Sequence, residues 1–477
     1  MVPHPIRRGF QLNPSRQSAG TFSRYTCTLA DPASSHFRRV FVRSPLSLRR
    51  LFFVLALATC FGAISLYAQS FNYNTNPPNR FAFAGVAPRA FPFTPSQCVA
   101  NFGLACYTPD LIRKAYNIPA SADGAGQTIV IVDAYGSPTV RQDLHIFDQE
   151  FGLPDPQLNI IYPGGQPVFN PLQHHHEVSW ASETNLDVQW AHAIAPKATI
   201  DLVVAANNYG NVLNNAVRYA VDHHLGNVIS LSWGAAEAAI RGAGNNTQVK
   251  QAHQIFQQAQ ASGITVLAAA GDWGATNLYS YTNALYPASD PLVTAVGGTN
   301  LFMDDSGTYQ NEWTWNDSNP NLCPFGCAYG AFGATGGAPS RLFPVPAFQA
   351  ALGHTSRSTS DVSYNASVYT AVMVYLGFNA NPNDNAFYFF GGTSEGAPQW
   401  AGITALVNQA AGHPMGYLSP ALYAVAAGSS YSSNFHDVTI GDNGLFGPGF
   451  PAGSGYDYPT GLGSPNVANL IHSLTGK

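Results

Sequence analysis

Short runs of apolar residues alternate with longer amphipathic stretches through the middle of this chain. Continuous apolar runs predict strands at 127–135, 198–206, 227–234, 263–271, 292–298 and 386–390. Helices are predicted between or after most of them, at 182–195, 212–225, 247–262 and 397–411. A strand that is apolar along its whole length is buried on both faces, and parallel sheets achieve this by packing helices on each side. We therefore expect an α/β fold with a doubly wound, mostly parallel sheet and helices on both faces.

The first 68 residues have the character of an export leader. Arginines are concentrated in residues 1–50, and residues 51–68 form an uncharged apolar run. This arrangement is typical of a secretory signal peptide, so we expect cleavage near Ala68 and a secreted, extracellular or periplasmic protein. A translation start later than Met1, a membrane anchor and a lipid attached to Cys60 are the alternatives, and the apolar run is barely long enough to span a bilayer.

Without this leader the chain is strongly acidic. The leader holds nine of the 21 Lys and Arg residues and one of the 26 acids, so the rest carries a formal charge of −13. Such a charge gives no electrostatic reason to bind nucleic acid. No later run is apolar enough to cross a membrane, and we expect a monomer without stable membrane association. The remaining cysteines form two close pairs, Cys98/Cys106 and Cys323/Cys327, which favours disulfides in an exported protein.

The segment GGTSEGAP places Ser394 between the last apolar run and a predicted helix. A serine at such a turn is a candidate nucleophile, and it needs a base. Gly392, Ser394 and Gly396 match the G-x-S-x-G elbow of α/β-hydrolases, which makes an esterase one alternative. No HGGG-like oxyanion segment is visible, however, and Pro398 stands early in the helix. A glycine-rich turn with a capping serine is the structural alternative.

Carboxylates stand where a histidine base would be expected. The turn and Asp133 resemble parts of subtilisin-like enzymes, but the helix that brings their histidine is replaced by residues 181–198. There Glu183 and Asp187 are four residues apart and share one helix face. In the structural alternative Ser182 caps this helix and the acids favour its positive end. Asp272 follows the strand at 263–271, and we expect it at the same sheet rim as Ser394.

Taken together, these motifs resemble the sedolisin family of serine-carboxyl peptidases from about Tyr107 to the C-terminus. The motifs, in family order, are Glu183-x-x-x-Asp187 before WAHAIAPKA, SLSWG, AAAGDWGA, GGAPSRLFPVPAFQ and GGTSEGAP. The resemblance implies a subtilisin-like sheet and a serine-type endopeptidase that acts on polypeptides. It implies that Glu183 is the general base, that Asp187 orients it, and that protonated Asp272 lies in the oxyanion hole with the Ser394 N–H. Carboxylate bases suit acid pH, so rate loss is expected as pH rises.

Two further expectations concern the surroundings of this site. SLSWG and the turn at Gly336–Gly337 are expected to pair with an extended peptide as an added strand. Trp190 and Trp233 are candidates to line specificity pockets, with a place in the core as the alternative. Residues 174–177 (HHHE) are expected in a solvated loop. Residues 301–385 are expected to be rich in loops.

The C-terminal block at 435–465 resembles the calcium-binding segment of the same family. Its ligands there would be carboxylates of Asp437 and Asp457 and carbonyls of Val438, Gly453 and Gly455. Calcium takes six to eight oxygen ligands, which suits a loop with little apolar periodicity. The resemblance implies one structural Ca²⁺, with plain Asp/Gly turns as the alternative.

The expected organisation is a leader at 1–68, an extended arm at 69–106 and a peptidase domain at 107–477. The stretch between Ala68 and Tyr107 is too short for the large pro-domain that the family usually carries, which puts self-activation in doubt. A non-catalytic, calcium-stabilised binding protein on a peptidase scaffold is the remaining alternative. All four catalytic positions are filled, which favours the enzyme.

Overall fold

The structure is a computed structural model of the chain. It describes Thr75, Arg80–Phe81 and residues 93–170, 175–242, 244, 246–322, 325 and 332–477. The predicted leader, most of the predicted arm and the Cys323/Cys327 pair lie outside the described residues. Cys98 and Cys106 form the predicted disulfide, with their Cα atoms 5.8 Å apart.

An eight-stranded sheet forms the centre of the fold, in the order β11-β10-β8-β6-β3-β5-β4, with β14 also paired to β10. The strands are β3 (Thr128–Ala134), β4 (Leu158–Ile161), β5 (Thr199–Ala205), β6 (Val228–Leu231), β8 (Thr265–Ala269), β10 (Thr294–Met303), β11 (Tyr309–Thr314) and β14 (Val362–Asn365). All these pairings are parallel except that of β10 with β11. The predicted doubly wound, mostly parallel sheet is confirmed.

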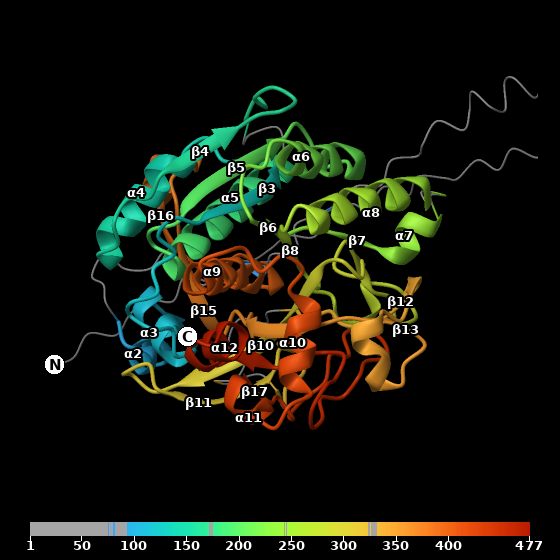
Figure 1. Cartoon of the computed structure of the whole chain (residues 1–477). Helices are drawn as coiled ribbons and strands as arrows, with labels where there is room; N and C mark the ends of the chain where they lie inside the picture. The colour runs from blue at the N-terminus through green and yellow to red at the C-terminus, as the bar shows by residue number, and fades with distance from the viewer. Residues whose placement is uncertain are drawn as a thin grey trace, which may run out of the picture. The chain divides into compact units, whose positions relative to one another are not determined.

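Helices cover both faces of this sheet. The main ones are α4 (Val140–Phe151), α5 (His175–Ile194), α6 (Gly210–Asp222), α8 (Asn246–Ala261) and α9 (Thr393–Ala411). Side chains alternate along a strand, so Ile129 and Ile131 of β3 join the core under α5 and α9, whereas Val130 and Val132 join the core under α6 and α8. In the view of Figure 1, α8 lies above strands β6 and β8 and α9 lies below them. The double covering explains why these strands are apolar throughout.

A second sheet has four strands in the order β1-β16-β15-β2. They are β1 (Arg80–Phe81), β2 (Ala105–Tyr107), β15 (Thr370–Leu376) and β16 (Ala386–Gly391). The run at 386–390 was predicted as a strand of the main sheet, and this is wrong, because β16 pairs antiparallel with β15. Its continuous apolar character arises because aromatic side chains from other elements, such as Phe102 and Phe151, pack on it. Apolar pattern alone does not reveal which sheet a strand joins.

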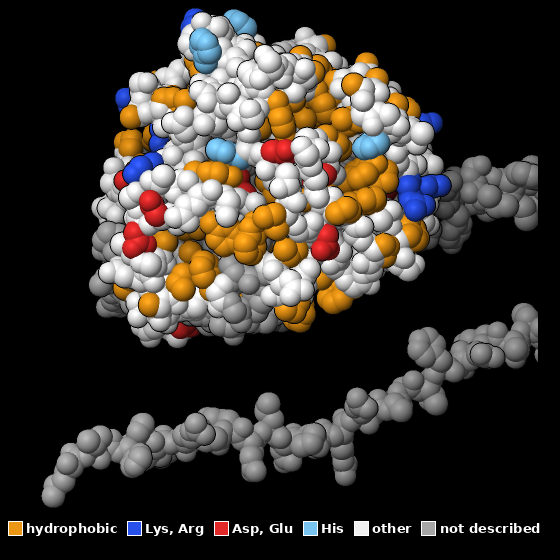
Figure 2. All heavy atoms as spheres, turned by 90° about the horizontal axis from the view of Figure 1, so that it is seen from below, with side chains coloured by type: hydrophobic (Ala, Val, Ile, Leu, Met, Phe, Trp, Pro, Cys, Tyr) orange, Lys and Arg blue, Asp and Glu red, His pale blue; other side chains and the backbone are white. Residues whose placement is uncertain are grey.

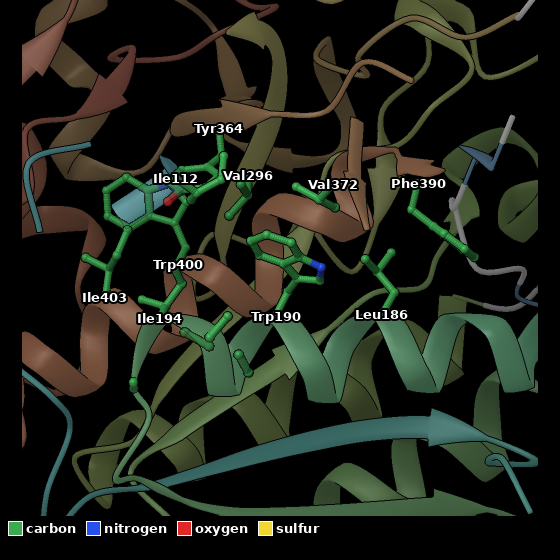
Figure 3. Packing of buried hydrophobic residues seen from close by; sticks show 14 of the residues in the cluster. Ile112, Leu186, Trp190, Ile194, Val296, Tyr364, Val372, Phe390, Trp400 and Ile403 are labelled. Carbon is green, nitrogen blue, oxygen red and sulfur yellow. The ribbon is translucent and has the colours of Figure 1, made fainter. Parts of the chain in front are cut away.

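Helix α5 ties the two sheets together. Figure 3 shows Leu186 and Trp190 of α5 beside Val372 and Phe390 of the four-stranded sheet. The Trp190 indole N–H donates to the carbonyl of Met373 at 3.0 Å. Helix α5, which carries Glu183 and Asp187, therefore packs against both the large and the small sheet.

Several boundaries differ from the prediction. Helix α5 begins at His175, not near Ser182, and the Ser182 hydroxyl donates to the Val178 carbonyl at 3.0 Å within the helix. The capping alternative is therefore wrong, because the helix already includes the residues before Ser182, among them the buried Trp180. Glu177, expected in a solvated loop, lies in the first turn of α5, is 8% exposed and accepts a hydrogen bond from the N–H of Asn170.

The remaining elements are short. The helices are α2 (Pro95–Phe102), α3 (Pro109–Ala115), α7 (Glu237–Gly242), α10 (Ser419–Ala426), α11 (Tyr431–Asn434), α12 (Val467–Thr475) and the 3₁₀ turns Gly274–Thr276, Ala347–Leu352 and Pro382–Asp384. The strand pairs are β7 (Ala235–Ala236) with β9 (Leu285–Tyr286), β12 (Pro339–Pro344) with β13 (Ser356–Ser358), and β17 (Phe435–His436) with β18 (Ser464–Pro465). The stretch 95–106, predicted as part of an extended arm, thus contains helix α2 and most of strand β2. Residues 301–385 contain more strands than the loop-rich prediction allowed.

Candidate active site

The structure gathers the four predicted site residues at one buried place. Glu183 and Asp187 lie on α5, Asp272 follows β8, and Ser394 lies in the first turn of α9. All four side chains are 0% exposed. Helices α5 and α9 pack along each other, and Glu183 interacts electrostatically with both Ser394 and Asp272. The site is therefore formed between two helices at the edge of the main sheet.

The turn before α9 holds Asp272 beside the residues that carry Ser394. Gly392 has φ +120°, a backbone conformation that favours glycine, and the helix begins directly after it. The backbone N–H and the hydroxyl of Thr393 each donate to Asp272 Oδ1 at 2.8 Å. The N–H of Gly271 in turn donates to the Thr393 hydroxyl at 3.0 Å. Thr393 therefore connects the turn that carries Ser394 to the end of β8. The G-T-S motif contains this residue, but its contacts were not predicted from the sequence.

Glu183 and Asp187 share their buried space with a third carboxyl. Burial raises the pKa values of Glu183 and Asp187 well above their usual range, and the nearby Asp133 raises both further. Burial also raises the pKa of Asp133 itself, to about 7. Asp133 lies near the end of β3, and its likeness to the first acid of subtilisin-like enzymes was the only signal in the sequence. Three carboxyls this close cannot all be ionised together, so the cluster holds protons in acid.

Two hydroxyl groups beside these acids lower the pKa values that burial raises. The hydroxyl of Ser394 lowers the pKa of Glu183, and that of Ser232 lowers the pKa of Asp187. Neither Ser394 Oγ nor the Glu183 carboxyl makes a well-formed hydrogen bond within the part of the chain that the structure describes. The Ser394 hydroxyl and the Glu183 carboxyl are therefore near enough to interact, without a well-formed hydrogen bond between them. Catalytic hydrogen bonds are often long before substrate binds.

The segments expected to flank a substrate reach this site. Gly336 lies against the end of β8, where its N–H donates to the carbonyl of Gly271 at 2.6 Å. A Cβ atom at Gly336 would fall 2.0 Å from the carbonyl oxygen of Ala270, so only glycine allows this approach. Trp190 and Trp233 are both 0% exposed, and the Trp233 indole donates to the carbonyl of Val132. Both tryptophans belong to the core. Pairing of a peptide with these segments stays a prediction.

The two halves of the predicted metal segment come together near the C-terminus. Both carboxyl oxygens of Asp437 accept from the N–H of Gly455, at 3.1 and 3.0 Å. Asp457 accepts from the N–H of Gly453 at 2.9 Å, and burial raises its pKa to about 6, with a smaller contribution from Asp437. Val438 is buried beside them. No group of three or more His, Cys, Asp or Glu side chains suited to a metal occurs among the described residues, and the predicted set contains only two such side chains.

A cavity of about 810 Å³ lies elsewhere, between α10, the 3₁₀ turn at 347–352 and the C-terminal loops. Its walls are mostly apolar, and hydrophobic side chains gather in several patches on the face seen from below in Figure 2. None of the four site residues lines it. Among the described residues, no helix combines the length and the apolar character needed to cross a membrane.

Comparison with known proteins agrees with this geometry. Residues 178–425 match the subtilase family. Kumamolisin of Bacillus sp. (strain MN-32) is 34% identical over 388 residues, which cover 77% of this chain and 63% of the relative. Sedolisin of Pseudomonas sp. (strain 101) is 30% identical over 385 residues, which cover 76% of this chain and 60% of the relative. The chain thus spans about three fifths of the length of these curated relatives.

A solved structure gives the same result. It is Pseudomonas sedolisin, described as a serine-carboxyl proteinase complexed with two molecules of pseudo-iodotyrostatin. It superposes with a TM-score of 0.68 at 28% identity, over 78% of this chain and 99% of that chain. The family match and the shared fold agree: the chain belongs to the subtilase family, and within the comparisons it is similar to the sedolisin-type serine-carboxyl peptidases.

Proposed function

We propose that this protein is a secreted peptidase that hydrolyses peptide bonds of polypeptides at acid pH through an acyl-enzyme on Ser394. The observation that carries the proposal is the common burial of Ser394, Glu183, Asp187 and Asp272 at one place. Carboxyls adjoin the serine where most serine enzymes have a histidine, so a mechanism based on carboxyl groups fits best. The same observation argues against the α/β-hydrolase alternative.

In the first step Ser394 Oγ attacks the carbonyl carbon of the scissile bond while its proton passes to Glu183. That proton then goes to the leaving amine as the C–N bond breaks, and the acyl group stays on Ser394. In the second half water attacks the ester while its proton passes to Glu183, and Glu183 returns that proton to Ser394 Oγ as the acyl C–O bond breaks and the acid product leaves. Glu183 must be ionised at the start, while Asp187 keeps a proton and orients it. Coupled carboxyls lose their protons in separate steps, which allows one charge on the cluster in acid.

Asp272 is proposed as the acid of the oxyanion hole, with the N–H of Ser394 as the second donor. Its Oδ1 already accepts two hydrogen bonds from Thr393, so the acid proton belongs on Oδ2, where it can donate to the developing oxyanion. An ionised Asp272 would repel that charge. Activity is therefore expected only where Asp272 is neutral.

The decisive experiment compares digestion of casein or haemoglobin at about pH 3–5 by the wild type and by Ser394→Ala, which removes only the nucleophilic oxygen. Wild-type activity that is lost in the variant, with an unchanged circular dichroism spectrum, supports the proposal. Equal activity in the two proteins contradicts it. Absence of activity in both favours the non-catalytic binding protein.

One structural Ca²⁺ is proposed in the C-terminal segment. The donor set is all oxygen, as calcium requires: carboxylates of Asp437 and Asp457 and carbonyls of Val438, Gly453 and Gly455. In support, burial raises the pKa of Asp457 to about 6 and the nearby Asp437 adds to that rise, whereas a cation would favour both carboxylates in their ionised form. The ion would hold the two halves of the loop together. Export through the leader at 1–68, a monomeric state and a peptidase domain at 107–477 complete the proposal.

A further inference from the structure

The residue directly after the nucleophile is a buried acid that this mechanism does not use. Glu395 lies in the first turn of α9 and is 0% exposed. Its Oε1 accepts a hydrogen bond from the Asn365 side-chain amide at 2.9 Å, while Oε2 makes none in the part of the chain that the structure describes. A buried carboxylate without a counter-ion is costly, and the N–H donor of Asn365 offsets only part of that cost. Burial therefore favours the neutral form.

The partner of Glu395 is held rigidly. Asn365 ends strand β14, and its side chain makes three further hydrogen bonds: to the carbonyl of Thr370 at 2.6 Å, from the Thr370 hydroxyl at 2.8 Å and from the N–H of Leu301 at 3.1 Å. Every polar atom of this amide is thus used. The hydrogen bond to Glu395 consequently connects the turn that carries Ser394 to a fixed point of the main sheet.

The groups that face Glu395 give its charged form no counter-ion. Tyr107 of β2 and Tyr364 of β14 interact with it electrostatically, and Glu312 of β11 acts on the same two tyrosines. Gln399, one turn further along α9, lies at 3.5 Å from Oε1. Arg113 of α3 acts on Tyr364, but neither it nor another cation of the described residues contributes to the pKa of Glu395. Burial raises that pKa well above its usual range, although hydrogen bonds from Asn365 and Gln399 act to lower it. Ionisation would place an unbalanced charge beside the nucleophile turn.

We infer that Glu395 is a positioning residue for Ser394: its side chain fastens the first turn of α9 to Asn365, and ionisation of this buried group, which has no counter-ion, destabilises that turn. The inference rests on the proposed peptidase function. It assigns part of the activity loss at higher pH to the support of the nucleophile, separately from the reacting acids Glu183, Asp187 and Asp272.

The test compares the full chain with Glu395→Gln and Glu395→Ala. The glutamine variant keeps an acceptor for Asn365 and cannot ionise, so its activity should persist to a pH about one unit higher than in the wild type, as a one-unit change in a controlling pKa does. The alanine variant loses the fastening, and its kcat should fall by roughly 10- to 100-fold with little change in KM, the usual cost of a misplaced catalytic group. Glu150→Gln, at an exposed position of α4, is the matched control and should match the wild type throughout.

Two results would overturn the inference: an alkaline limit in Glu395→Gln that coincides with that of the wild type, or an unaltered kcat in Glu395→Ala. If the alanine variant fails to fold, the glutamine variant decides alone. Thermal midpoints measured between about pH 4 and pH 7 give an answer that needs no activity, because the advantage of Glu395→Gln over the wild type must grow with pH. The peptidase proposal itself is tested separately: it fails if Ser394→Ala digests protein as fast as the wild type does.

Discussion

Glu312 offers a quantitative test of how burial makes this fold dependent on pH. It lies on β11, is 5% exposed and has no role in the proposed chemistry. The hydroxyls of Tyr116 and Thr299 donate to its Oε1 at 2.8 and 2.7 Å, and the Ser464 hydroxyl donates to Oε2. Burial is the main reason that its pKa rises from 4.5 to about 7. The perturbation is Glu312→Gln, which keeps the shape and removes the titration.

The magnitude follows from linkage between protonation and folding. In the unfolded chain Glu312 ionises near its ordinary pKa of 4.5, but in the folded protein it keeps its proton to about pH 7. The unfolded state therefore binds fewer protons in this window, and the free energy of unfolding falls as pH rises. The contribution is fully present below pH 4.5 and lost by about pH 7. At about 1.4 kcal/mol per pH unit, the loss is about 3 kcal/mol.

The variant should lack this loss. At about pH 4 we expect it to be less stable than the wild type by about 1 kcal/mol, because an amide replaces a well-bonded acid. At about pH 7 it should be more stable by about 2 kcal/mol, the 3 kcal/mol gain less that cost. The measurement is urea-induced unfolding followed by tryptophan fluorescence at several pH values, with Glu150→Gln as an exposed control. A difference between variant and wild type that stays constant from pH 4 to pH 7 would refute the reasoning.

Three further predictions concern the site and the metal. Ser394→Ala should reduce kcat by a factor of about 1,000 or more without altering the fold, and residual activity near that of the wild type would exclude the acyl-enzyme. Asp272→Asn keeps an amide donor toward the oxyanion and an acceptor for Thr393, whereas Asp272→Ala loses a donor that contributes about 100- to 1,000-fold to kcat. The asparagine variant should therefore retain at least about tenfold more activity than the alanine variant. Equal losses of activity in the two variants would count against Asp272 as a donor. Chelation with EDTA should lower the free energy of unfolding by about 3 kcal/mol if calcium is about 100-fold above its Kd, and should have no further effect on Asp457→Ala; an unchanged melting temperature of the wild type would remove calcium from the proposal.

The main sheet could be predicted because its signal is local. Strands β3, β5, β6, β8 and β10 are apolar along their length and alternate with helices, and parallel order follows from that alternation. The position of β16 could not be predicted in the same way. Its apolar run looks the same from the sequence, and its place in the smaller sheet depends on pairing with β15 and on aromatic side chains supplied from elsewhere in the chain.

The site shows the same division between local and distant information. Motifs and their order predicted Ser394 and its acids as one site, because spacing on one helix or at one strand end can be read from the sequence. The hydrogen bonds that hold these groups in place could not be predicted from the sequence. Thr393 and Asp272 are 121 residues apart in the sequence, and Glu395 and Asn365 are 30 apart. Contacts of this kind depend on how two elements pack. In the same way, Asp133 comes close to Glu183 and Asp187 only because β3 packs against α5.

The nucleophile stands where the two sheets meet. Strand β16 of the small sheet ends at Gly391, and the next N–H, that of Gly392, donates to the carbonyl of Ala366, just beyond β14 of the large sheet, at 2.5 Å. A side chain at Gly391 would collide with that same carbonyl, 2.6 Å away. Slippage between the sheets would therefore displace the turn that carries Ser394. On heating, hydrolysis should cease while the large sheet is still intact, so that catalysis reports partial unfolding earlier than circular dichroism does.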